Sequence, residues 1–348
     1  MTSALVDDLV AFASIPAPTS FEEARLGWLE ERLAGLPGAA TRDAVGNLVW
    51  RIGAGTPDVL LLAHVDTVFP AETALRFEER GGRIAGPGIG DNAAAVVTVL
   101  DVASRVAPDA GGTLAVAFTV GEEGLGNLRG AHEACKRLRP ACAIAVEGHG
   151  LEQVLVDAVG SVRLRVSVAG PGGHSWEDRG TPSALHALMQ IGAGLAADGS
   201  AATPVNVGVV SGGQSVNTIA AEAQLVVEMR SLDEAALEDF AGHVRALRVE
   251  PPLAVEVAEV GRRPGGTMDR SATLIAVVRD VRQRLGLPDM LGAGSSDANA
   301  ALARGIPAVT LGVAHGGRMH SLDEWIEVAS LELGARQLED VLERLKMA

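Results

Sequence analysis

Two adjacent glutamates, Glu122 and Glu123, follow a strand-forming run at residues 113–118 and lie between glycines. Successive side chains of a strand point to opposite faces, so two carboxylates at its end must diverge. Two such charges close together repel each other, and one of them would stay protonated. A divalent metal ion removes that repulsion, because one carboxylate can hold the ion while the other faces what the ion binds. The alternative is an ordinary solvated turn with two acidic residues.

A histidine and an aspartate in the segment His64-Val65-Asp66 end an apolar run at residues 58–63. Residues two apart on a strand share a face, so Asp66 can lie behind His64 and orient its ring. A metal-ligating imidazole usually donates its other N–H to such a carboxylate, which fixes the tautomer and strengthens the ligand. His64 is therefore a candidate metal ligand, and a hydrogen-bonded interior histidine is the alternative.

Three further residues fall at the ends of predicted strands or in the loops that follow them. Asp91 comes after a glycine-rich turn at residues 86–90, Glu147 ends the run 141–146, and His320 precedes the last helix. Open α/β sheets place their sites along this edge. Taken singly, Asp91 could be a helix N-cap and Glu147 a surface residue.

Taken together, these side chains match what a pair of zinc-like ions needs. Each ion requires about four nitrogen or oxygen ligands, with one position left for water. A bridging carboxylate holds such ions ~3.5–4 Å apart, the spacing of co-catalytic hydrolases. Two histidines and three carboxylates are available, with one glutamate to spare: His64, His320, Asp91, Glu123 and Glu147, and then Glu122.

Composition bounds the class of protein. The chain has 348 residues, 47% of them hydrophobic, which is enough for two domains with sizeable cores. Its net charge of −15 makes nucleic acid and anionic membranes poor partners. The first residues carry no basic start and no long apolar run, and no segment has the length and apolarity needed to span a bilayer. Two cysteines, Cys135 and Cys142, give no disulfide framework, so we expect a cytoplasmic protein.

The elements that must position these residues follow an alternating α/β pattern in the first part of the chain, typical of a helix-covered sheet. Helices are predicted at 3–13, from a cap at Thr19 or Ser20 to Leu36, at 91–106 and at 130–138; strands are predicted at 46–52, 58–63, 113–120 and 141–147.

The pattern changes near Ala158. Residues 162–168 alternate strictly between apolar and polar, which predicts a strand with one exposed face. The order strand, helix, strand, strand, helix, strand then follows, which is the ferredoxin-like split unit. The α/β pattern resumes after Gly265-Gly266. We therefore expect one domain built from 1–158 and 265–348, with a second domain, 159–264, inserted into it.

The motifs resemble those of the co-catalytic zinc peptidases and deacylases, a family that includes peptidase T, carboxypeptidase G, acetylornithine deacetylase and succinyl-diaminopimelate desuccinylase. The tract 121–130 and the segment 170–175 are most similar to the peptidase T-like branch. The motifs that carry the resemblance are His64-Val65-Asp66-Thr67-Val68, Gly86-Pro87-Gly88-Ile89-Gly90-Asp91, Gly121-Glu122-Glu123-Gly124, Glu147-Gly148, Gly173-His174-Ser175 and Met319-His320-Ser321.

The resemblance implies a zinc-exopeptidase-like catalytic domain with an inserted lid and dimerisation domain, and it implies a role for each site residue. Glu122 is the expected general base, Asp66 the expected partner of His64, and the peptide bond from Asp91 to Asn92 is expected to be cis. The implied metal ligands are Asp91 as the bridge, His64 and Glu147 for one ion, and Glu123 and His320 for the other.

The inserted domain is expected to complete the site. In relatives the histidine that matches His174 reaches into the partner's active site and stabilises the oxyanion. Asn217 and Arg230 match positions that hold a substrate carboxylate, for which the planar fork of arginine is suited; a strand-end salt bridge is the alternative for Arg230. The loop with Asp297 and Asn299 resembles a substrate-facing loop without an assigned role.

The chain departs from the family pattern at three places. Asn92-Ala93-Ala94 stands where many relatives have x-Lys-Gly, Gly121 where an aspartate is common, and Glu147 where the carboxypeptidase-like branch has an aspartate. The first two could tune metal affinity, and the third conserves a carboxylate. None of them removes an expected ligand.

These observations predict a metal-dependent hydrolase that cleaves the amide bond of small peptides as a di- or tripeptide exopeptidase. An N-acyl amino-acid deacylase is the alternative, and a catalytically silent binding protein on the same fold is the rival from another class. Two divalent ions are expected, Zn²⁺ or else Co²⁺ or Mn²⁺, in a homodimer formed through the inserted domain. The other histidines, expected to be surface or structural, are His132, His149, His186, His243 and His315.

Overall fold

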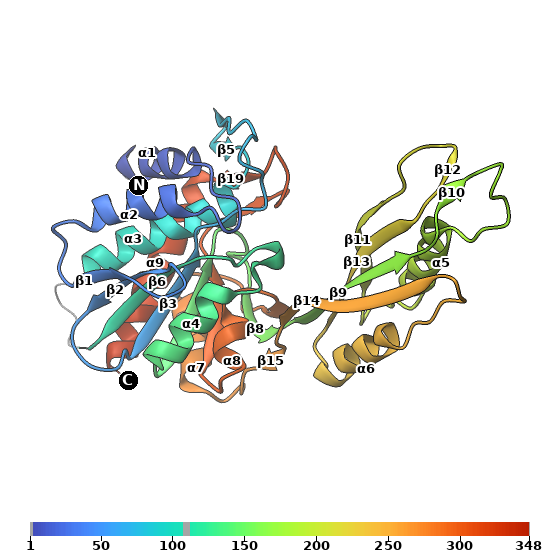
Figure 1. Cartoon of the computed structure of the whole chain (residues 1–348). Coiled ribbons are helices and arrows are strands. Elements are labelled where there is room, and N and C mark those ends of the chain that lie inside the picture. The colour runs from blue at the N-terminus through green and yellow to red at the C-terminus, as the bar shows by residue number, and fades with distance from the viewer. Residues whose placement is uncertain (1–2, 107–111, 348) are drawn as a thin grey trace. The chain divides into compact units, whose positions relative to one another are not determined.

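The computed structural model describes residues 3–106 and 112–347. The chain divides into two compact units, one formed by Met1–Ala158 with Gly266–Ala348 and the other by Val159–Gly265 (Figure 1). None of the described helices has the length and apolarity needed to cross a membrane.

The first unit is built on a mixed β-sheet, and the apolar runs form its central strands as predicted. Its central strands run parallel: β3 pairs with β6 and β7, and β7 with β17, whereas the pairs β2–β6 and β17–β8 are antiparallel. The described strands lie in the order β1 (Ala39–Arg42), β2 (Leu48–Ile52), β6 (Leu114–Thr119), β3 (Val59–His64), β7 (Cys142–Glu147), β17 (Ala308–Gly312), β8 (Val154–Ala158) and β15 (Gly266–Thr267), with β16 (Leu291–Gly294) also on β8.

Helices cover both faces of this sheet, which is why its central strands are apolar on both sides. Leu61 and Ala63 of β3 belong to one hydrophobic core, and their neighbours Leu60 and Leu62 belong to another. The first core includes side chains of α1 (Ser3–Ala13), α2 (Glu23–Leu33), α3 (Ala95–Val106), α7 (Thr273–Arg284) and α9 (Val328–Met347); the second includes side chains of α4 (Arg129–Leu138) and α8 (Ala298–Leu302).

Two helix starts differ from the sequence prediction. The residues expected to cap the second helix do not cap it, because the Thr19 hydroxyl donates to the Asp66 carboxylate and α2 begins only at Glu23. The helix expected from Asp91 begins at Ala95, because Ile89–Ala94 forms an irregular π-type turn, η1, in which Asp91 is not helical. Both helices therefore begin later in the chain than predicted.

A small second sheet of the first unit ties two loops of the site together. The strands β18 (Gly316–Gly317), β19 (Trp325–Glu327), β5 (Arg83–Ala85) and β4 (Glu78–Arg80) pair in that order, all antiparallel. The glycine-rich turn to Asp91 leaves β5, and the loop with His320 connects β18 to β19. Pairing of β19 with β5 therefore brings together loops more than two hundred residues apart.

The second unit is an antiparallel sheet with helices on one face. Along β9, Val162, Leu164 and Val166 enter the core with α5 and α6, and the alternate side chains face away. The sheet order is β11 (Val205–Gly212), β13 (Glu222–Ser231), β9 (Gly160–Ala169) and β14 (Ala254–Arg263), with α5 (Ala184–Ala197) after β9, α6 (Glu234–Arg245) after β13, and a short ladder of β10 (Gly173–His174) with β12 (Thr218–Ile219).

Candidate dinuclear metal centre

The five side chains expected to bind metal lie together in the first unit. Asp91 is central: its Oδ1 lies 3.0 Å from Nε2 of His64, and its Oδ2 lies 3.0 Å from Nε2 of His320. Glu147 approaches the first histidine, with Oε2 3.5 Å from Nε2 of His64. Glu123 approaches the second, with Oε1 3.2 Å from Nε2 of His320. The two oxygens of one aspartate thus face two different histidine–carboxylate pairs.

Each of these pairs forms, with Asp91, a group that could hold a metal ion. In the group His64, Asp91 and Glu147, and in the group Asp91, Glu123 and His320, one ligand atom per residue lies within 4.8 Å of the others. A third such group in the described part of the chain joins Glu122 and Glu123 to His64. Nitrogen and carboxylate oxygen are the donors of catalytic zinc sites, so the donor set fits two such ions.

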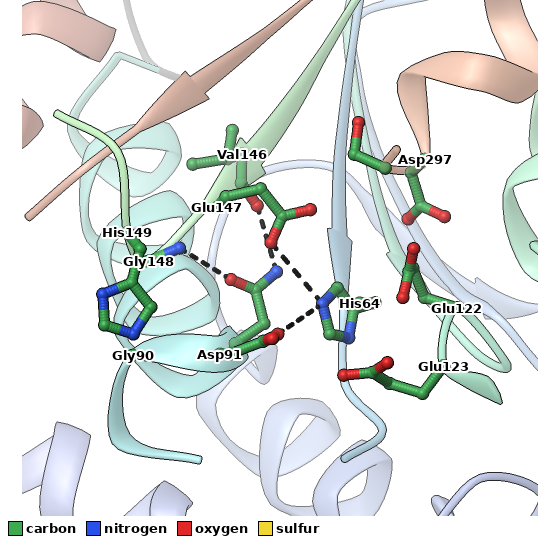
Figure 2. A network of polar contacts seen from close by, with 12 residues as sticks. His64, Gly90, Asp91, Glu122, Glu123, Val146, Glu147, Gly148, His149 and Asp297 are labelled. Atoms are coloured by element: carbon green, nitrogen blue, oxygen red, sulfur yellow. Dashed lines mark hydrogen bonds and ion pairs between the residues drawn. The ribbon is translucent and has the colours of Figure 1, made fainter. Parts of the chain in front are cut away.

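Strand ends bring these ligands to one edge of the main sheet (Figure 2). His64 is the last residue of β3, Glu147 the last of β7, and Glu123 lies four residues beyond β6. Asp91 comes from the turn η1. His320 adopts a left-handed backbone with φ 63° and its side chain is 49% exposed, whereas His64 is buried, so the cluster opens to solvent on the His320 side.

Asp66 contacts both His64 and the backbone of the glutamate pair. Nδ1 of His64 lies 3.1 Å from the Asp66 backbone oxygen and 3.6 Å from its carboxylate, so the main chain of Asp66 provides the nearer partner of the ring. The carboxylate accepts the N–H of Glu122 and that of Glu123, each at 3.0 Å. Asp66 therefore orients three site residues at once.

Two more buried side chains hold the backbone just before the glutamates, and sequence reasoning missed both. Oδ1 of Asn47 accepts the N–H of Val120 at 3.0 Å, and Oε1 of Glu22 accepts the N–H of Gly121 at 3.1 Å. Arg129 donates to the same Glu22 oxygen at 2.9 Å. With Asp66, four consecutive N–H groups are fixed, which pre-organises the turn that carries Glu122 and Glu123.

Asn92, noted from the sequence as part of a departure from the family pattern and of a peptide bond expected to be cis, holds the end of β7. Its side-chain amide donates to the Val146 oxygen at 3.0 Å and accepts the N–H of Gly148 at 2.9 Å (Figure 2). These two groups flank Glu147 on the chain. The Asp91–Asn92 peptide bond is cis, as the resemblance implied. Within this dipeptide, Asp91 supplies the shared carboxylate and Asn92 positions that of Glu147.

Burial and the close approach of acidic groups shift the pKa values of the residues in the cluster. Burial raises the pKa of Glu147 to about 7, and burial together with the charge of Asp91 raises the pKa of Glu123 to about 7. Hydrogen bonds to Asp91 and Glu123 raise the pKa of His320 to about 10. Burial opposes ionisation of Asp91, yet its bonds to His320 and His64 hold its pKa below the usual value. Without a metal, the carboxylates must therefore be balanced by protons, which bound cations would replace.

The side chain of Asp297 faces that of Glu122 (Figure 2). It is buried, its Oδ2 accepts the Thr119 hydroxyl, and its Oδ1 has no hydrogen-bond partner among the described residues. Burial and the charge of Glu122 raise the pKa of Asp297 to about 7. The neighbouring Asn299 is also buried, and its Oδ1 accepts the N–H of Ser296 at 3.0 Å.

The other predicted site residues belong to the second unit, where each forms a hydrogen bond or an ion pair with a neighbouring residue. Nδ1 of His174 accepts the N–H of Trp176 at 3.2 Å. Oδ1 of Asn217 accepts the Ser215 hydroxyl at 2.7 Å. Arg230 forms the salt bridge considered as the alternative, with Nε 2.6 Å from Glu228, while its side chain stays 42% exposed.

Comparisons with known proteins show similarity over almost the whole chain. The succinyl-diaminopimelate desuccinylase of Acidiphilium cryptum is 27% identical over 334 residues, covering 86% of this chain and 86% of that protein. A tripeptidase from Staphylococcus aureus has a similar fold, with a TM-score of 0.80 at 23% identity over 99% of this chain and 98% of that one. The aminopeptidase PepT from Bacillus cereus follows at a TM-score of 0.75 and 23% identity, with 98% of each chain covered.

The model of Peptidase family M20/M25/M40 matches residues 60–344, most of the chain. The match spans all five candidate metal ligands. It confirms the family resemblance that the motifs indicated, and with it a hydrolase. The chain belongs to peptidase family M20/M25/M40.

Proposed function

We propose that this protein is a dinuclear metallohydrolase that cleaves the amide bond of di- and tripeptides as an exopeptidase. The observation that carries the proposal is the pair of histidine–carboxylate groups that share Asp91, with Glu122 buried beside them and assigned to neither. In this assignment Asp91 would be a ligand shared by the two ions, His64 and Glu147 would complete one site, and Glu123 and His320 would complete the other.

When bound, two Zn²⁺ ions (or Co²⁺ or Mn²⁺) polarise the scissile carbonyl and lower the pKa of a water molecule toward ~7. The protein's part is proton transfer and orientation. Glu122 accepts a proton from the attacking water as its oxygen bonds to the carbonyl carbon. Glu122 then donates that proton to the leaving amine as the C–N bond breaks. Asp66 fixes the base by accepting its backbone N–H.

The second unit supplies substrate contacts in this proposal. His174 stabilises the oxyanion in the site of a partner subunit, and Asn217 and Arg230 bind the substrate carboxylate. The exposure of Arg230 supports its role, because a half-exposed guanidinium can still present a planar edge to a carboxylate. Such a cation is suited to recognising the carboxylate at the end of a small peptide.

A homodimer through the second unit is supported by an apolar edge. Strand β11 ends its sheet, and Val209 and Val210 on it are 58% and 57% exposed. Helix α5 beside it exposes Met189. An unpaired apolar edge strand is a template for pairing with another chain. We expect light scattering to give a dimer, and we expect lysine at Val209 and Val210 to shift it to the monomer.

A substrate panel tests the activity. Metal-free protein would be reconstituted with Zn²⁺, Co²⁺ or Mn²⁺ in turn and assayed with unblocked di- and tripeptides and with N-acetyl and N-succinyl amino acids. We expect kcat/KM to be higher for the peptides and to require metal. A preference for the acylated amino acids would instead support a deacylase, the alternative favoured by the desuccinylase relative. Metal-free protein that cleaves the panel equally well would contradict both.

Either activity fits the cytoplasm, where small peptides and acylated amino acids occur. The fold similarity to the tripeptidase and to PepT is the reason to place the peptidase first.

A further inference from the structure

Glu324 is a buried carboxylate that no part of the proposed mechanism uses. It is 0% exposed, and both of its oxygens face backbone N–H groups of the turn that carries Asp91. Oε1 accepts the N–H of Gly90 at 3.0 Å and that of Asp91 at 2.7 Å, and Oε2 accepts the N–H of Gly88 at 3.0 Å. Burying a carboxylate costs free energy unless hydrogen bonds compensate for the lost water, and three backbone N–H groups do so here.

His149 completes the surroundings of this carboxylate. Its Nε2 lies 2.7 Å from Oε1 of Glu324, and its Nδ1 is buried with no hydrogen-bond partner among the described residues. An imidazole with one ring nitrogen at a carboxylate and the other without a partner carries its proton on the first, so Nε2–H donates to Glu324. His149 stands two residues after Glu147, so this bond connects Glu324 to a second ligand-bearing loop.

The third loop is that of Glu324 itself. His320 lies four residues before it, and the Glu324 backbone oxygen accepts the N–H of Gly86 at 2.7 Å. The loops of Asp91, Glu147 and His320 therefore meet at a single carboxylate.

Three glycines allow the loops to approach this closely. A Cβ on Gly90 would lie 2.1 Å from Nε2 of His149, and a Cβ on Gly316 would lie 2.4 Å from its Nδ1. A Cβ on Gly148 would lie 1.9 Å from the Gly90 oxygen. Figure 2 shows His149 above Gly90, on the side of Asp91 away from Glu122. The loops around Gly90, Gly148 and Gly316 leave no room for another side chain, and such close packing makes this part of the protein rigid.

We propose that Glu324, assisted by His149, is a positioning residue that sets the placement of Asp91 between the two metal sites. Neither side chain belongs to the ligand groups. The role requires a carboxylate, because the Glu324 side chain accepts a hydrogen bond from each of the three backbone N–H groups and from His149. A glutamine would turn one acceptor into a donor that faces an N–H group, and the turn would have to move.

The inference rests on the proposed metal sites, and its test therefore measures metal binding separately from turnover. Co²⁺ would be titrated into metal-free Glu324→Gln, the wild type and Asp323→Asn, with calorimetry and visible absorption as readouts. Asp323 is a matched control, since it is the adjacent carboxylate, is half-exposed and pairs with Arg318.

We expect Glu324→Gln to bind Co²⁺ ~10–100-fold more weakly, the usual effect of losing a partner that orients ligands. Its cobalt absorption bands should shift, kcat should fall more than KM changes, and excess metal should restore part of the activity. Asp323→Asn should match the wild type in each respect. Wild-type affinity and an unchanged spectrum in folded Glu324→Gln would overturn the proposal, whether or not the wild type proves to be a peptidase.

A second variant covers the case in which Glu324→Gln does not fold. His149→Asn leaves in place the three hydrogen bonds from backbone N–H groups to the Glu324 carboxylate. It shortens only the side chain that reaches Glu324 from the Glu147 loop. We expect a loss in Co²⁺ affinity of up to ~10-fold with the same spectral shift. Unchanged affinity and an unchanged spectrum in this variant would likewise contradict the proposal.

Discussion

At the scale of single residues, Glu122 and Glu123 are neighbours to which the proposal assigns two different chemical roles. Both backbone N–H groups are bound by the same Asp66 carboxylate, so neither glutamate can rotate its main chain. One ligand atom of each glutamate lies within 4.8 Å of the other and of His64, and Glu123 also contacts His320 in the group formed with Asp91. The separate roles that we propose for the two glutamates therefore rest on this second group rather than on divergent side chains.

The first prediction tests that division. Glu122→Gln should lower kcat by about 10²–10⁴, because the amide cannot accept the proton that water releases. Metal content, measured by plasma mass spectrometry, should stay at the wild-type value because Glu122 is not an assigned ligand. The control is Glu133→Gln on α4, which should leave kcat unchanged. Loss of metal with loss of rate would show instead that Glu122 is a ligand.

The second prediction concerns the buried carboxyl of Asp297, whose Oδ1 has no hydrogen-bond partner among the described residues. Its pKa is raised from 3.8 to about 7, so the folded protein holds this proton more tightly than the unfolded chain. The associated stability is fully present below pH 3.8 and is lost as pH rises through about 7. Asp297→Asn keeps an oxygen for the Thr119 hydroxyl and removes the titration.

Thermal melts of metal-free protein measure this effect. Asp297→Asn should exceed the wild type in Tm by a few degrees above pH 7, and the difference should shrink toward pH 4. A Tm difference that grows as the pH falls would have the wrong sign for a raised pKa.

At the scale of elements, the turn after β6 depends on residues from other parts of the chain. Gly121 has φ 66°, which favours glycine, and a Cβ on it would lie 2.1 Å from Nη1 of Arg129. Displacing Arg129 would disturb Glu22 and, through it, the Gly121 N–H. Gly124 offers a comparison, since its φ is 48° but a Cβ there would meet nothing within 4 Å.

The third prediction uses this pair of glycines. Gly124→Ala should cost about 1–2 kcal/mol in the free energy of unfolding, from left-handed backbone alone. Gly121→Ala should cost roughly 1–3 kcal/mol more, because a buried acceptor loses its partner. Urea unfolding gives both values. The change at Gly121 should also lower kcat; equal costs for the two variants would show that the Arg129 contact has no energetic role.

At the scale of the whole molecule, the two units are joined where strands already lie side by side. Ala158 and Gly266 face each other in the register of β8 and β15, so the first unit leaves and resumes its chain at neighbouring positions. Within the second unit, Ser161 and Arg263 likewise face each other on β9 and β14. Each unit has its own hydrophobic core, so we expect the first unit to fold without the second.

The fourth prediction follows from this arrangement. Residues 159–265 would be replaced with an Asn-Gly turn, which joins paired antiparallel strands. The shortened chain should fold cooperatively and bind two Co²⁺ ions, since all assigned ligands lie in the first unit. Its kcat/KM should fall by at least ~10²-fold, because the proposed oxyanion donor His174 is gone. Full activity in the shortened chain would remove the second unit from the mechanism.

The sequence by itself determined the types of residue in the site and the edge at which they gather. Apolar runs predicted β3, β6 and β7, and parallel strands must end at the same edge, so His64, Glu123 and Glu147 could be expected together. Periodicity also marked the change at Ala158, because a half-exposed strand alternates and a central one does not. The predicted start of α3 was wrong by four residues, since the backbone around Asp91 is not helical.

Only the tertiary structure decided which buried groups hold those ligands in place. Glu324 and Gly88 are 236 positions apart, and Asn47 and Val120 are 73 apart. Glutamate and asparagine are common surface residues, and local pattern does not mark the few that become buried. Their partners are backbone N–H groups, which every residue but proline has, so their pairing depends on how the loops pack rather than on residue type.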